Sequence, residues 1–174
     1  MKKTSFILAA ATIALASGLV AQASKKYPIL QPQMKVEGST YSSPAAKLGD
    51  KPAEAWTPTT MGASVDGKPQ AGKVTTLVGE IVDFSCYLQV GKHGDKHRAC
   101  GQKCLQTGQP IGLLTSDGNL YMLMEEEHDP RRDGQTSDFR KKAAEHTAHI
   151  LEVTGTLASH AGYSALYVQG FVAQ

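Results

Sequence analysis

The sequence predicts one mainly β domain with two helices, of the α+β class, in its C-terminal part. Runs rich in β-branched and aromatic residues, separated by Gly, Asp and Asn, indicate five strands after residue 73. Two more polar segments, residues 96–106 and 138–146, have the length and end signals of helices. About 100 residues of such sequence bury one core, so a single domain is expected.

The first strand and the first helix are expected on either side of a short loop. The run VTTLVGEIVDFSCYL, residues 74–88, favours a long strand in which Gly79 marks a bulge or bend. A loop over residues 92–95 then leads to the helix at residues 96–106. Asp95 is the expected N-cap of that helix because an Asp side chain accepts hydrogen bonds from the first free amides.

The remaining elements follow in an order that matches a known small barrel. Asp117-Gly118 is a strong turn signal, so residues 111–115 and 120–124 are expected to form a hairpin. The segments that follow are a charged loop at 125–137, the helix at 138–146 and a hairpin of residues 150–157 and 165–172.

Five strands with a helix between the third and the fourth match a five-stranded Greek-key barrel of the oligonucleotide/oligosaccharide-binding (OB) type. The helix at residues 96–106 is then an insertion between strands one and two. A split antiparallel sheet with both helices on one face is the alternative.

The N-terminal part is expected to lie outside this domain. Residues 1–23 form a signal peptide, with Lys2 and Lys3 before an apolar run and Ala21-Gln22-Ala23 at the cleavage point. Residues 24–73 carry six of the eight prolines and little periodicity, so they predict an extended arm before the domain at 74–174.

Charge excludes one class of partner. The chain has 18 Lys and Arg against 16 Asp and Glu, and removal of Lys2 and Lys3 with the signal leaves 16 of each. A net charge of zero argues against nucleic acid as a partner. Export also places the chain in an oxidising compartment, outside the membrane after cleavage, where an odd number of cysteines leaves at least one thiol unpaired.

The main chemical signal is a cluster of Cys and His residues. If residues 96–106 are helical, His97, Cys100 and Cys104 fall on one stripe about 60° wide, with Cys86 on the preceding strand. These four residues are the expected ligands of a transition metal, zinc first and copper(I) as the alternative. His93, in the loop before the helix, is a possible additional or replacement ligand. A disulfide from Cys86 to Cys100 or Cys104, with one spare thiol, is the competing interpretation.

Other polar residues are interpreted as structural. Either Asp83 or Glu80, on the strand before Cys86, can orient a ligand histidine, because residues i and i+3 of a strand point to opposite faces. The acidic run at residues 125–129 is interpreted as a solvated connection. His146 and His149, near the end of the second helix, are expected to favour its dipole.

Several strings also resemble a group of small exported bacterial proteins. The resemblance covers roughly residues 74–172 and is carried by Gly79-Glu80-Ile81-Val82-Asp83 before Cys86-Tyr87-Leu88, His97-x-x-Cys100-x-x-x-Cys104, Gly108-Gln109-Pro110-Ile111-Gly112-Leu113-Leu114 and Val153-Thr154-Gly155. It implies an OB-like fold and a shared Cys/His motif, and brings no defined activity.

These features predict an exported protein, periplasmic or secreted, that holds or delivers a metal ion through its Cys/His cluster. A periplasmic protein partner is a further expectation. One rival hypothesis is an interaction module with a structural disulfide, and another is a thiol-redox protein. The chain lacks the serine-hydrolase, phosphate-loop and zinc-protease motifs, so an enzyme is not expected.

Overall fold

The computed structural model describes residues 35–126 and 138–169. The expected signal peptide, the first part of the expected arm and most of the expected charged loop therefore lie outside the described residues.

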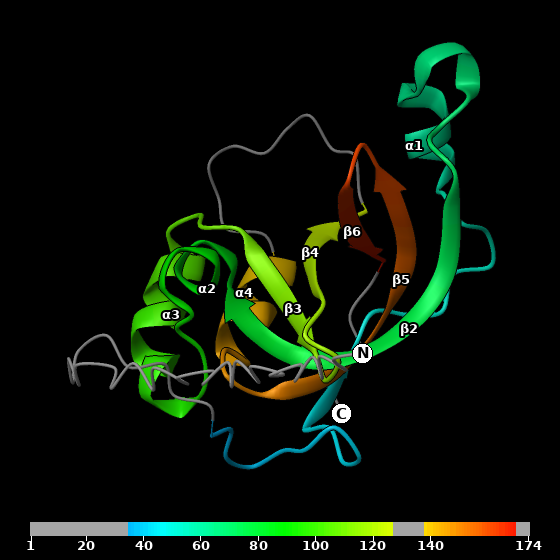
Figure 1. Ribbon diagram of the computed structural model, residues 1–174. Helices are drawn as coiled ribbons and strands as arrows, with labels where there is room; N and C mark the ends of the chain where they lie inside the picture. The colour runs from blue at the N-terminus through cyan, green and yellow to red at the C-terminus, as the bar shows by residue number, and fades with distance from the viewer. Residues whose placement is uncertain (1–34, 127–137, 170–174) are drawn as a thin grey trace, which may run out of the picture.

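Five strands close into a barrel (Figure 1). The strands are β2 (Gly72–Asp83), β3 (Ile111–Thr115), β4 (Leu120–Glu125), β5 (Ile150–His160) and β6 (Tyr163–Val168). Around the barrel β2 pairs with β3, β3 with β4, β4 with β6, β6 with β5, and β5 with β2. Only the β4–β6 pair among these is parallel. This order confirms the OB-like prediction, and the closure excludes the open split sheet.

An extra strand comes from the segment expected to be an irregular arm. Strand β1 (Ala46–Leu48) pairs in parallel with β5 and places Leu48 opposite Val153. Ala46 and Leu48 are 6% and 3% exposed and belong to the main core cluster. The structure thus differs from the sequence expectation here, because a three-residue strand is too short to carry a visible alternation.

Trp56 helps to dock the rest of this segment. Trp56 packs edge-to-face on Tyr167, with 5.2 Å between the ring centroids. Its indole Nε1 donates to the Gln70 carbonyl at 2.8 Å. Beyond it lie the short helix α1 (Pro58–Ala63) and the 3₁₀ turn η1 (Val65–Gly67).

The other helices gather at the opposite end of the barrel from α1 (Figure 1). They are α2 (Phe84–Val90), the 3₁₀ turn η2 (Asp95–His97), α3 (Arg98–Gln106) and α4 (Asp138–Glu145). The helix predicted at residues 138–146 is confirmed as α4. None of the helices in the described ranges is long and apolar enough to cross a membrane.

Two local predictions were wrong. Residues 84–88 are not the end of a strand but the start of α2, because the Asp83 side chain accepts a hydrogen bond from the Cys86 amide at 3.1 Å and caps the helix. Gly91 ends this helix in the left-handed conformation, with φ of 67°. Asp95 does not cap α3 either, since its carboxylate accepts instead from Arg98 Nη2 at 2.6 Å and His97 takes the N-cap position.

The buried position of Leu48 makes β1 testable. Replacing Leu48 by Ala is expected to lower the free energy of unfolding by about 2–5 kcal/mol, as for other core leucines. The neighbouring exposed Lys47, which forms only a surface ion pair with Glu152 at 3.2 Å, is the control. Lys47→Ala should cost at most about 1 kcal/mol in urea unfolding. Equal, small losses for both variants would place β1 outside the cooperative core.

Candidate metal site

Three metal-binding side chains meet at the end of β2. The donor atoms of Asp83, Cys86 and His97 all lie within 4.8 Å of one another. Asp83 is the last residue of β2, Cys86 lies in the first turn of α2, and His97 ends η2. The cap formed by Asp83 turns the chain into α2, and this turn brings Cys86 back toward the carboxylate.

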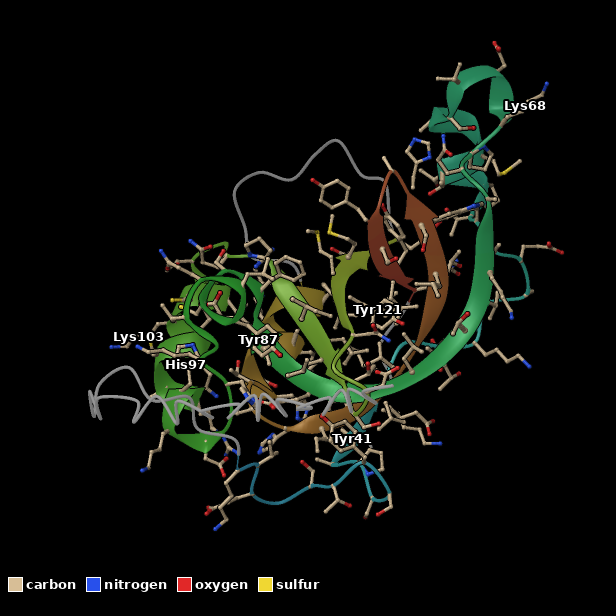
Figure 2. All side chains as sticks on the ribbon, viewed as in Figure 1. Tyr41, Lys68, Tyr87, His97, Lys103 and Tyr121 are labelled. Atoms are coloured by element: carbon tan, nitrogen blue, oxygen red, sulfur yellow. The ribbon has the colours of Figure 1, made fainter. Side chains whose placement is uncertain are left out.

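His97 reaches this point from a different segment of the chain. Figure 2 shows it on the helical side of the barrel, where it directly precedes α3. The side chain is buried, and burial lowers the pKa of its imidazole, an effect that the nearby Asp83 carboxylate partly offsets. A histidine held neutral keeps a ring nitrogen available as a ligand.

Two atoms of the cluster lack partners. Asp83 Oδ2 and His97 Nε2 are both buried and have no hydrogen-bond partner among the described residues. Buried polar groups are nearly always satisfied, and an orphaned one points to a bound ion, a ligand or a water. That two such atoms belong to residues of one donor cluster is a sign of a ligand at this point.

Cys104 and Cys100 of α3 behave differently from each other. Cys104 is partly buried next to the cluster: burial first, and then the neighbouring Asp83 carboxylate, raises the pKa of its thiol to about 12. Cys100 is exposed and is not part of the three-residue cluster. The structure therefore brings together Cys86 and His97 of the expected ligands, with Cys104 beside them, and leaves Cys100 at the surface.

His93 lies near the cluster but is engaged elsewhere. Its Nδ1 is 2.8 Å from Glu80 Oε2, and its ring packs edge-to-face on Tyr87. The other Glu80 oxygen accepts from the Gly94 amide at 2.6 Å. The two carboxylates of β2 thus divide the roles that the sequence left open, since Glu80 orients a histidine and Asp83 joins the donor cluster.

Sequence reasoning missed Asp83 as a donor. Its signal was present, because Asp83 and Gly91 bracket seven residues in the pattern of an N-cap and a helix stop. The β-branched run before Asp83 hid that pattern by favouring a longer strand.

Cys86 and Cys104 do not have the properties of reactive thiols. Burial, followed by the Asp83 carboxylate, raises the pKa of Cys86 as it does that of Cys104. Catalytic cysteines need a lowered pKa, because the thiolate is the nucleophile. All three cysteines are described, and none forms a disulfide.

Comparison with known proteins adds no assignment. No protein-family model matches the chain, and neither a curated protein nor a solved structure matches it.

The two histidines that follow α4 predict that the stability of the fold depends on pH. His146 and His149 pack with ring centroids 5.7 Å apart, and burial is the main cause that lowers the pKa of each below 6.5. As the pH falls below 6.5, the unfolded chain takes up protons that the folded chain resists, so the free energy of unfolding should fall. Urea unfolding of metal-free protein at about pH 7.5 and about pH 5.5 measures this loss.

His146→Asn should reduce that acid-induced loss, because the variant removes a group that only the unfolded state protonates readily. The matched control is His160→Asn, at an exposed histidine, which should keep the parental loss. An unchanged pH dependence in His146→Asn would show that His146 does not contribute.

Proposed function

We propose that this chain is an exported protein that holds or delivers one transition-metal ion, with Asp83, Cys86 and His97 as ligands and Cys104 as the fourth. The observation that carries the proposal is the cluster of three donors within 4.8 Å that contains two buried, unpartnered atoms. Cys104 is added because its partly buried thiol is close enough to the Asp83 carboxylate for that charge to raise its pKa.

The mixed donor set supports zinc over copper(I). Zinc accepts sulfur, imidazole nitrogen and carboxylate oxygen in one tetrahedral site. Copper(I) prefers soft sulfur ligands, so a carboxylate beside the thiols is a poor match for it. Tetrahedral zinc holds its ligand atoms about 3.3–3.8 Å apart, so the observed upper limit of 4.8 Å leaves at most about 1.5 Å of closure for any pair of donors.

The rival hypotheses have less support. A structural disulfide would leave Asp83 Oδ2 and His97 Nε2 without partners, while a metal ion satisfies both. A thiol-redox role conflicts with the raised pKa values of Cys86 and Cys104. Metal binding accounts for the two unpartnered atoms and is compatible with the raised thiol pKa values, because an ion displaces the thiol protons on binding.

Metal analysis of the purified full-length protein tests the ligand set. The parent should bind one zinc or cobalt ion, and cobalt should show absorption from sulfur ligation. Asp83→Asn should weaken metal binding by more than about 10-fold. Replacing a residue that only hydrogen-bonds to a metal ligand already costs about that much, and Asp83 is proposed as a ligand itself. Asn caps a helix as well as Asp, so α2 should remain folded and the loss can be attributed to the donor.

Serine substitutions of the cysteines provide the matched controls. Cys86→Ser and Cys104→Ser should weaken metal binding and remove the metal-dependent gain in melting temperature. Cys100→Ser, which alters a surface thiol, should change neither. If Cys100→Ser alone lost the metal, or if the parent were metal-free with a disulfide, the assignment would fail.

Export is supported by the basic start, the apolar run and the Ala21-Gln22-Ala23 sequence. On this proposal the protein works in the periplasm or outside the cell. The intact mass of the protein recovered from that compartment should correspond to a chain that starts at Ser24. A recovered mass that still includes Met1 would contradict cleavage.

A further inference from the structure

A large apolar cavity has none of the three donor residues Asp83, Cys86 and His97 in its lining. Its volume is about 900 Å³, and its lining comes from α1, α2, β4 and the β5–β6 hairpin. Small-molecule sites in proteins usually have volumes of about 300–1,000 Å³ and apolar or aromatic walls. Trp56, Phe84, Met122, Tyr163 and Tyr167 provide such walls here.

Several apolar side chains that line the cavity are exposed to solvent. Within residues 35–126 and 138–169, three of the seven exposed large apolar residues line this cavity: Leu88, Met124 and Tyr163. Tyr163 is 79% exposed and Leu88 is 66% exposed. Single exposed apolar residues need no explanation, but a group of them around a hollow is typical of a binding site.

The charge of the lining favours a cation. The described residues that line the cavity include Glu125, Glu126 and the exposed His160, and neither Lys nor Arg. Trp56 and the tyrosines add aromatic faces, which attract ammonium groups.

The Glu126 carboxylate indicates which chemical group the ligand carries. Its side chain is buried, with 4% exposure, although the sequence predicted a solvated acidic loop. One carboxylate oxygen, Oε1, accepts from the Thr57 amide at 2.9 Å, the Thr57 hydroxyl at 3.0 Å and the Thr60 hydroxyl at 2.8 Å. The other oxygen, Oε2, is buried and has no hydrogen-bond partner among the described residues.

An unpartnered carboxylate oxygen on a residue that lines an apolar cavity is costly unless a ligand satisfies it. We propose that this cavity binds an apolar organic molecule that carries an ammonium group, and that the ammonium donates to Glu126 Oε2. The apolar part of the ligand lies against the methionine and aromatic walls. A hydrogen bond between charged partners inside an apolar site then selects amines over neutral molecules of equal length.

This binding site does not depend on the proposed metal site. Phe84 and Leu88 of α2 line the cavity, while Cys86 of the same helix belongs to the donor cluster. Residues 84 and 88 share one face of a helix, and residue 86 lies about 200° away from residue 84. Failure of metal binding would therefore leave the cavity proposal untouched, and the reverse also holds.

The single tryptophan provides a fluorescence probe of ligand binding in the cavity. Trp56 is the only tryptophan, and it lines the cavity, so its fluorescence should report occupancy. Titration of the full-length protein with decylamine should give saturable changes, confirmed by calorimetry. Decanol and decanoate have the same chain length without the ammonium, and they should bind about 10- to 100-fold more weakly.

Glu126→Gln tests the role of the carboxylate. The amide oxygen can still accept from Thr57 and Thr60, but the amide nitrogen replaces Oε2 with a donor that cannot accept from an ammonium. Decylamine should lose about 10- to 100-fold in affinity, and decanol should change little. Glu152→Gln, the same change at a surface ion pair with Lys47, should alter neither.

A second variant keeps the test valid if Glu126→Gln loosens α1. Ala165 lies between Tyr163 and Tyr167 on the face of β6 that lines the cavity. Ala165→Leu should therefore reduce the binding of decylamine and decanol alike, by filling the space. The proposal is overturned if no probe binds saturably, if amine and alcohol bind equally, or if Ala165→Leu leaves decylamine binding intact.

Discussion

Closure of the barrel through β5 is the constraint on which the other features depend. Along one edge β5 pairs with β2, and along the other it pairs first with β1 and then with β6. The change of partner requires close backbone approach. A Cβ on Gly155 would overlap the Tyr167 carbonyl, and one on Gly49 would overlap the Thr154 carbonyl. Because these two glycines leave that space empty, β1 and β6 share one strand edge and the sheet can close.

Strand β2 ends at Asp83, whose side chain both caps α2 and joins the donor cluster. The carboxylate divides its two oxygens between tasks, since Oδ1 caps α2 and Oδ2 remains unpartnered in a residue whose neighbours in the donor cluster are Cys86 and His97. Glu126 divides its oxygens in the same way at the cavity, where Oε1 holds α1 and Oε2 is left over. In both places a structural hydrogen bond positions the carboxylate, and the second oxygen is available to a ligand.

Much of the fold could be predicted because its signals are local. The Asp117-Gly118 turn identified the β3–β4 hairpin, and the order of strands and helices was sufficient to predict an OB-like barrel. The end of β2 was misassigned because strand propensity in residues 74–83 continues into Phe84 and Tyr87, while a single capping hydrogen bond decides the boundary. Strand β1 was missed because only its pairing with β5 makes it a strand.

By itself the sequence determined that Cys and His residues lie close together along the chain, that basic and acidic residues are nearly equal in number, and the strand order, since each depends on residue type and near-neighbour spacing. Only the tertiary structure decided which residues meet. It added Asp83 to Cys86 and His97, directed His93 to Glu80 and left Cys100 exposed. It also buried Glu126, which an acidic run predicts to be solvated. Burial and proximity between distant segments result from the packing of the whole chain, and no short window of sequence contains that information.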